Sequence, residues 1–325
     1  MPGRLLRGPL GRRAAFCGLI VAVVFTAGGC GNVGERTGLE AKGDGPVKVV
    51  TTTNFITDTV REIGGDRVSV SALMGPGVDP HLYKASAGDV NDLREADVIF
   101  YGGLYLEAKM QEVLEEIGEN RPAYAVTEDI PRQMLLAAPG GAAEGEEYDP
   151  HVWFDPALWT FAARTVRDRL IEVDPAGEAG YRRNAREFIA AAAELDRDAA
   201  RRLSVIPERR RVLVTSHDAF RYLGRRYGVE VAAIQGLSTA TEATTADIER
   251  IAALIADRGV KAVFIESSVP SQTVDAVLAS ARTKGQDAVV GGELFSDAAG
   301  RDGSPEGTWA GMFESNLDLL VEGLR

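Results

Sequence analysis

The three histidines are the side chains whose type and spacing most readily suggest chemistry. The chain has 325 residues, and His81, His151 and His217 are its only histidines. His81 and His151 each follow an Asp-Pro pair, whereas His217 follows an apolar segment through Thr215-Ser216. A single loop histidine is more often a solvated or capping group. Three at such positions favour a shared metal site, because neutral imidazole is the commonest metal ligand among side chains.

Carboxylates near strand ends could complete such a site. Asp297 closes the segment Glu293-Leu-Phe-Ser-Asp297, directly after an expected strand at 288–290. A lone loop aspartate is usually solvated, but a position beyond a strand end joins this one to the histidines as a candidate ligand. Five further carboxylates lie near the candidate ligands or at strand ends. They are candidates either for hydrogen bonds to imidazole N–H groups or for helix caps and solvated charges: Asp149, Asp155, Asp218, Glu266 and Glu293.

Short β-branched segments that alternate with amphipathic stretches must position these residues. Alternating strands and helices predict mostly parallel sheets with right-handed crossovers. In such sheets ligands bind beyond the carboxyl ends of the strands, so His81 and His217 occupy expected binding positions in two different halves. The expected strands are 47–53, 68–73, 98–101, 212–215, 231–234, 262–266 and 288–290. The expected helices are 55–63, 89–95, 107–117, 157–172, 177–203, 219–227, 246–257, 273–281 and 309–324.

The N-terminus has the layout of a secretory signal. Four arginines among the first 13 residues precede an uncharged, mostly apolar run at 14–27, which ends at Gly28-Gly29-Cys30. The run is shorter than the ~20 residues that a membrane-spanning helix needs. Cys30 follows small residues and precedes a polar, glycine-rich segment, which resembles a bacterial lipoprotein processing site. We predict lipidation at Cys30; the alternative is simple cleavage that leaves Cys30 as an incidental thiol.

The predicted helix at 177–203 would be about 40 Å long at 1.5 Å per residue, enough to run the length of a domain. It separates two α/β halves, after a loop at 127–150 that breaks the strand and helix alternation. The chain is therefore expected to divide into a signal peptide at 1–29, a flexible tether at 30–46, an N-terminal α/β lobe at 47–175, a long linking helix at 176–206 and a C-terminal α/β lobe at 207–325.

Composition excludes several classes of function. The net charge is -12, and no basic stripe occurs beyond the first 13 residues, so we expect no nucleic-acid partner. Cys17 would leave with the signal peptide, and Cys30 would then be the one remaining cysteine. The mature chain therefore cannot form an internal disulfide or a zinc site built from several cysteines.

Six segments, taken together, resemble a known family. The chain is similar to the metal-binding solute receptors of bacterial ABC importers, in the TroA-like zinc and manganese group. The matching segments occur in the order of that family: Met74-Gly-Pro-Gly-Val-Asp-Pro-His81-Leu-Tyr, Gly102-Gly-Leu-Tyr-Leu-Glu-Ala-Lys-Met110, Asp149-Pro-His-Val-Trp-Phe-Asp155, Val214-Thr-Ser-His217-Asp-Ala-Phe220, Phe264-Ile-Glu-Ser-Ser268 and Gly291-Gly-Glu-Leu-Phe-Ser-Asp297.

The resemblance implies two Rossmann-like α/β lobes joined by one long helix, with a metal site in the cleft between the lobes. The family's metal ligands would fall on His81 and His151 in the first lobe and on His217 and Asp297 in the second. Such N and O donors suit Zn²⁺ and accept Mn²⁺ or Fe²⁺ as the transported solute. Manganese relatives often carry Glu in place of His217, and some zinc receptors have a His-rich loop near 133–147. This chain has neither feature.

The function that follows from the resemblance is capture of a divalent metal outside the cytoplasm. The receptor, a monomer held on the membrane by a lipid anchor at Cys30, would deliver the metal to an ABC permease driven by a cytoplasmic ATPase. It would itself catalyse no reaction. One alternative is a secreted zinc hydrolase that uses His81, His151 and His217, with Glu266 or Glu293 as the base. A second is a surface adhesin lipoprotein, a role that metal capture does not exclude.

Overall fold

The first lobe is built on a four-stranded parallel sheet with strand order β2-β1-β3-β4. The structure, a computed structural model, describes residues 45–140 and 145–325. In the registers, Val47 pairs with Val68 across β1 and β2, and Val49 pairs with Val98 across β1 and β3. The central strands are buried and rich in β-branched residues, as expected for a sheet covered on both faces. The strands are β1 (Val47–Thr51), β2 (Val68–Ala72), β3 (Val98–Tyr101) and β4 (Ala123–Ala125).

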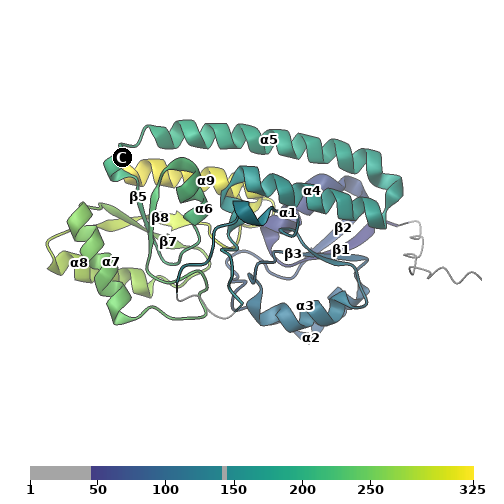
Figure 1. The fold of residues 1–325 in the computed structure, drawn as a ribbon, viewed down its shortest axis with the longest axis horizontal. Helices are drawn as coiled ribbons and strands as arrows, with labels where there is room; N and C mark the ends of the chain where they lie inside the picture. The colour runs from purple at the N-terminus through teal and green to yellow at the C-terminus, as the bar shows by residue number, and fades with distance from the viewer. Residues whose placement is uncertain (1–44, 141–144) are drawn as a thin grey trace, which may run out of the picture. The chain divides into compact units, whose positions relative to one another are not determined.

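The second lobe contains two parallel strand pairs, β5 with β6 and β7 with β8. Strands β5 and β7 lie in contact, so that the two pairs extend one layer (Figure 1). Within the described residues, the pairings between named strands are all parallel, which confirms the predicted α/β class. The strands are β5 (Val212–Thr215), β6 (Glu230–Ala233), β7 (Ala262–Glu266) and β8 (Val289–Leu294).

Helices cover both faces of the two sheets. Figure 1 shows α1, α4, α5 and α9 above the strands, with α2 and α3 below the first sheet and α7 and α8 below the second. The helices of the first lobe are α1 (Asn54–Gly64), α2 (Ala87–Glu95), α3 (Gln111–Gly118) and α4 (Pro156–Val173). Those of the second are α6 (Arg221–Tyr227), α7 (Thr245–Arg258), α8 (Gln272–Thr283) and α9 (Trp309–Leu324).

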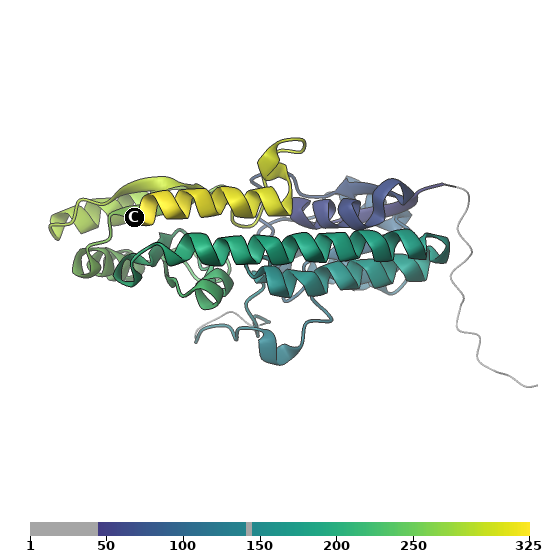
Figure 2. The same ribbon diagram turned by 90° about the horizontal axis from the view of Figure 1, so that it is seen from above.

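One long helix, α5 (Glu178–Ser204), joins the lobes. It packs on α1 and α4 of the first lobe and on α6 and α9 of the second. Figure 2 shows α5 running beside α4 at one end and beside α9 towards the other. Its 27 residues correspond to about 40 Å. The predicted linking helix is thus present, and it contacts both lobes along its length.

Aromatic side chains fill the core where the two lobes meet. The rings of Phe55 and Trp153 are 4.6 Å apart between centroids, and those of Phe154 and Phe220 are 4.4 Å apart. The His151 ring lies 5.2 Å from that of Trp153, so the core directly supports a candidate metal ligand. Large rigid rings fix the backbone beneath the site because they leave little room for movement.

Three of the differences from the expected elements have a physical reason in the structure. Strand β4 was not predicted, because its three residues are too few to show a pattern. Strand β8 continues past Val290 to Leu294, because two glycines there let the backbone pass close to Phe264 and Leu319. Helix α3 begins at Gln111 rather than Glu107, because Glu107 is buried and its carboxylate accepts the N–H groups of Gly102 and Gly103.

The predicted signal peptide, most of the tether and Cys30 lie outside the described residues. Within 45–140 and 145–325, no helix is both long and apolar enough to cross a membrane.

Candidate metal centre

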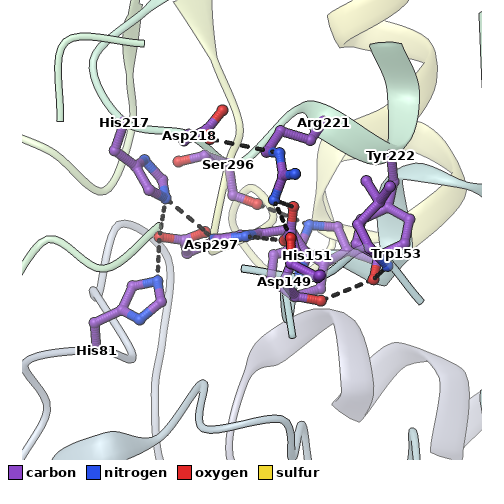
Figure 3. Close-up of polar contacts among 12 residues, drawn as sticks. His81, Asp149, His151, Trp153, His217, Asp218, Arg221, Tyr222, Ser296 and Asp297 are labelled. Carbon is purple, nitrogen blue, oxygen red and sulfur yellow. Dashed lines mark hydrogen bonds and ion pairs between the residues drawn. The ribbon is translucent and has the colours of Figure 1, made fainter. Parts of the chain in front are cut away.

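Four loops bring the candidate ligands together. His81 follows β2, and His151 immediately precedes a 3-10 turn at Val152–Phe154 that leads into α4. His217 comes two residues after β5, and Asp297 comes three residues after β8. These four side chains, which the sequence predicts as a set, meet between the lobes (Figure 3).

The geometry of the four groups fits one small ion. One ligand atom from each residue can be chosen so that all four lie within 4.8 Å of one another. His217 Nε2 is 3.2 Å from Asp297 Oδ2 and 3.3 Å from His151 Nε2. Asp297 Oδ1 is 3.5 Å from His151 Nε2, and Asp297 Oδ2 is 3.8 Å from His81 Nε2. Donors at the corners of a four-coordinate site about 2 Å from the ion have separations of this size.

The four candidate ligands are buried, and two of them present atoms without hydrogen-bond partners among the described residues. His151, His217 and Asp297 are fully buried, and His81 is 2% exposed. Among the described residues, His81 Nε2 and both carboxylate oxygens of Asp297 have no hydrogen-bond partner. Buried polar atoms are rarely left without a partner, since each costs free energy. An ion at the centre would satisfy all of these atoms at once.

Carboxylates behind two of the imidazoles set the direction of their rings. Glu266 on β7 bonds His217 Nδ1 at 2.5 Å and accepts the His217 backbone N–H at 2.8 Å. Asp149 Oδ1 bonds His151 Nδ1 at 2.8 Å. With Nδ1 engaged in this way, Nε2 of each ring is left to face the centre, as in carboxylate–histidine–metal arrangements. Two of the five carboxylates singled out in the sequence therefore support ligands.

The other three carboxylates have different surroundings. Asp155 caps α4 by accepting the Ala157 N–H, and Glu293 is exposed to solvent. Asp218 lies 3.6 Å from Arg221, and burial together with the nearby charge of Asp149 raises its pKa to about 6. Asp155 and Glu293 thus take the helix-cap and the surface role, respectively, that the sequence left open.

Burial and neighbouring charges shift the pKa values of His217 and Asp297 in opposite directions. Burial lowers the pKa of His81 to about 3. Burial also opposes a charge on His217, but the carboxylates of Asp297 and Glu266 outweigh it and raise the pKa of His217 well above its usual value. Burial likewise disfavours the Asp297 carboxylate, yet the neighbouring imidazoles, His217 first, hold its pKa below the usual range. Without metal, the centre therefore holds an ion pair between His217 and Asp297.

The segment that carries Asp297 is held from the first lobe. Trp153 Nε1 donates to the Ser296 carbonyl at 3.0 Å. On the other side of Asp297, Asn54 at the start of α1 accepts the Ala299 N–H and donates to the Ala299 carbonyl, both at 2.8 Å. Asp297 follows a strand of the second lobe, but side chains of the first lobe fix the backbone around it.

Several supporting residues were not identified from the sequence. Tyr222 receives the Leu136 N–H and donates to the Asp149 carbonyl at 2.9 Å, and Arg221 donates to the Asp149 carboxylate at 3.3 Å. Both lie on α6, which begins four residues after His217. Their partners are more than 70 positions away, so no local motif marks them. The one local signal in the sequence is the Asp-Pro pair directly before His81 and before His151, which places Asp149 next to a candidate ligand.

Three neutral imidazoles and one carboxylate would leave a single net positive charge on a bound divalent ion. N and O donors of this kind suit Zn²⁺, Mn²⁺ and Fe²⁺, whereas Cu⁺ prefers sulfur. Four protein donors fill a tetrahedral site and leave no open position for a reactive water. Glu266, one of the two bases considered for a hydrolase, is already bonded to His217. The arrangement is suited to holding an ion.

Comparison with known proteins finds relatives that are named for metal binding or metal uptake. The family model for ZnuA, zinc-uptake complex component A, periplasmic, matches residues 49–323. Manganese-binding lipoprotein MntA of Bacillus subtilis (strain 168) is 42% identical over 311 residues, which cover 95% of this chain and 99% of that protein. Zinc-binding protein TroA of Treponema pallidum (strain Nichols) is 41% identical over 312 residues, covering 96% and 99%.

A third relative and one solved structure extend the comparison. The iron ABC transporter substrate-binding lipoprotein MtsA of Streptococcus pyogenes serotype M1 is 30% identical over 307 residues, covering 93% of this chain and 95% of that protein. The solved structure of periplasmic zinc-binding protein TroA from Treponema pallidum superposes with a TM-score of 0.82 at 44% identity, covering 86% of this chain and 99% of that chain. The chain therefore belongs to the ZnuA family of periplasmic zinc-uptake components.

Proposed function

We propose that this protein is the extracytoplasmic receptor of an ABC importer for a divalent transition metal, and that His81, His151, His217 and Asp297 bind the metal. The observation that carries the proposal is the set of four buried donor groups whose ligand atoms lie within 4.8 Å of one another. His81 Nε2 and both carboxylate oxygens of Asp297 have no hydrogen-bond partner among the described residues. Family membership supports transport as the use of the site.

The transported solute is Zn²⁺ or Mn²⁺, with Fe²⁺ also compatible with the donors. Three relatives are named for manganese, zinc and iron, respectively. Three imidazoles favour zinc over manganese on affinity alone, because zinc stands far above manganese in the Irving–Williams order. Selection of the metal in the cell therefore depends on availability and geometry as well as on affinity.

The partners are a membrane permease and its cytoplasmic ATPase. A lipid on Cys30 would hold the receptor at the membrane, with the signal peptide at 1–29 removed and residues 30–46 acting as the tether. The lobes at 47–175 and 207–325, joined by 176–206, would act as a monomer. Relatives named as lipoproteins support the anchor. The receptor would bind and release metal without catalysing a reaction.

The experiment that tests the proposal is thermal unfolding of the purified protein with and without Zn²⁺. A ligand present at ~1,000 times its Kd adds about 4 kcal/mol to the free energy of unfolding, so the wild type should melt at a clearly higher temperature with metal. His217→Ala removes one donor and should abolish this shift. Glu293→Gln, which changes an exposed carboxylate upstream of Asp297, should keep it. An unchanged shift in His217→Ala would remove that residue from the site.

A further inference from the structure

The triplet Asp-Pro-His occurs at 79–81 and at 149–151, and both copies contain the same aspartate–histidine hydrogen bond. In each copy, Oδ1 of the aspartate accepts the backbone N–H of the histidine two residues on, at 2.8 Å in the first and 3.0 Å in the second. The proline between them fixes its own φ and has no N–H group to compete for the carboxylate. Each aspartate therefore holds the backbone of a candidate metal ligand.

The second oxygen of each aspartate bonds to a side chain of the other lobe. Thr239, in the loop after β6, donates its hydroxyl to Asp79 Oδ2 at 2.5 Å. Arg221, at the start of α6, donates from Nη1 to Asp149 Oδ2 at 3.3 Å, beside His151 in Figure 3. Thr239 is 8% exposed and Asp149 is fully buried, so each bond has one partner that water hardly reaches. Both triplets are thus tied to the second lobe in the same way.

We propose that Thr239 and Arg221 are positioning residues for metal binding, each of which fixes a first-lobe histidine through the aspartate of its Asp-Pro-His triplet. The inference rests on the proposed function, because it assigns both residues to the same metal site. If the lobes separate, both aspartates lose their second partner and both histidines lose a fixed position. Since coupling between sites is reciprocal, a metal ion that fixes the histidines also holds the lobes together.

The Thr239–Asp79 and Arg221–Asp149 bonds differ in how strongly the position of the histidine depends on them. Asp149 bonds both the ring and the backbone of His151, so both of these direct contacts remain if Arg221 is lost. Among the described residues, the ring of His81 has no comparable carboxylate behind it, and Asp79 bonds only its backbone. The position of His81 therefore depends more strongly on the connection to Thr239.

The first test measures metal dissociation from the purified protein. Thr239→Val removes the hydroxyl at nearly constant volume, and Thr241→Val changes an exposed residue of the same loop as a matched control. Transfer of Zn²⁺ to an excess of a chromogenic chelator should be roughly tenfold faster in Thr239→Val, because the lost hydrogen bond is to a charged group. Thr239→Ser, which restores the hydroxyl, should return the wild-type rate. Equal rates in Thr239→Val and wild type would overturn the proposal.

A double-mutant comparison separates positioning from general stabilisation. Asp79→Ala removes the group through which Thr239 is proposed to act. Adding Thr239→Val to Asp79→Ala should therefore leave the dissociation rate unchanged, whereas independent effects would multiply. Multiplied effects would contradict the proposal, because Thr239 would then act by another route. Arg221→Gln should accelerate dissociation less than Thr239→Val, by roughly threefold, the size typical of a partly exposed ion pair.

A second readout needs no metal. Hydrogen exchange at the His81 backbone amide, measured on the metal-free protein, should be faster in Thr239→Val than in wild type and unchanged in Thr241→Val. If the wild type binds no Zn²⁺, the proposed function fails, yet this exchange rate still decides whether the connection exists. If the wild type binds Zn²⁺ and Thr239→Val leaves His81 exchange unchanged, the positioning role alone is wrong.

Discussion

At the scale of single residues, the metal-free centre contains an ion pair between His217 and Asp297. Asp297 and His217 lie 3.2 Å apart without water access, and Glu266 bonds the far side of the same imidazole. His81, in contrast, is neutral because burial lowers its pKa to about 3. A metal ion entering the centre would therefore replace a proton on His217, whereas His81 has no proton to lose.

This replacement predicts proton release on binding. The pKa of His217 is raised well above its ordinary value by the carboxylates of Asp297 and Glu266, so its imidazole keeps a proton to higher pH than an ordinary histidine does. Metal binding needs the deprotonated ring, so about one proton should leave per Zn²⁺ bound, and affinity should fall as the pH falls below the pKa of His217. Calorimetry at pH 7.5 in buffers of different ionisation enthalpy measures this number.

The same calorimetry on the variant Glu266→Gln tests the cause of the raised pKa of His217. Glu266 helps to raise the pKa of His217, so Glu266→Gln should bring that pKa down and reduce the number of protons released at pH 7.5. The same variant should also bind metal more weakly, because the ring of His217 loses the carboxylate that orients it. Binding of Zn²⁺ by the wild type with no proton release would show that His217 is neutral before metal arrives.

At the scale of elements, hydrogen bonds from α1 fix the backbone of the segment that follows Asp297. Asn54 makes three hydrogen bonds to the backbone of Ala299 and Gly300, whereas Arg61, about two turns further along the helix, forms an exposed ion pair with Asp302. Both contacts join α1 to the same segment. They differ in burial and in their distance along the chain from the ligand.

Substitutions in α1 should therefore have unequal effects. Asn54→Ala should lower the free energy of unfolding by about 1–3 kcal/mol, since it leaves partly buried backbone groups without partners, and should weaken Zn²⁺ binding. Arg61→Ala, the matched control, should change stability by less than about 1 kcal/mol and leave metal affinity intact, because exposed ion pairs contribute little. Chemical unfolding and competition titration with a chelator measure the two quantities. Equal effects on metal affinity would contradict the role given to Asn54.

The elements themselves were largely predictable from the sequence. Buried strands such as Val98–Tyr101 carry runs of large apolar residues, and α5 carries a long helical pattern, so both were recognised from composition and period. The short strand Ala123–Ala125 has no such pattern and forms because β3 offers it a partner edge. Its structure follows from its neighbour rather than from its own sequence.

The candidate site was predictable in part, and for a physical reason. The histidines and Asp297 stand at strand ends or in proline-fixed loops, which the sequence displays directly. The residues that hold them do not: Thr239 bonds Asp79 across 160 positions, and Asn54 bonds Ala299 across 245. Such bonds are decided by the packing of two lobes, so they leave no spacing or motif in a single sequence.

At the scale of the whole molecule, the contacts of α5 limit how far the lobes can move. This helix packs on α1 and α4 in one lobe and on α6 and α9 in the other, so a wide opening would have to break packed helix faces. Motion of small amplitude at the rim of the site, where Thr239 meets Asp79, breaks only a hydrogen bond. We therefore expect modest closure on metal binding.

Small-angle scattering tests this expectation. The metal-free and Zn²⁺-loaded proteins should have closely similar radii of gyration, because a long helix packed on both lobes leaves no free hinge. A large compaction on loading would instead show a wide clamshell movement. The variant Thr239→Val, measured without metal, checks whether the rim contact affects the resting shape.

The central claim is that one divalent metal ion binds between the lobes. The most direct measurement is metal analysis by plasma mass spectrometry on purified protein that has been stripped with a chelator and then offered Zn²⁺ and Mn²⁺ together at defined free concentrations. We predict one equivalent of metal in the wild type and none in the double variant His81→Ala/His217→Ala. A wild type without stoichiometric metal, or a double variant that retains it, would contradict the account.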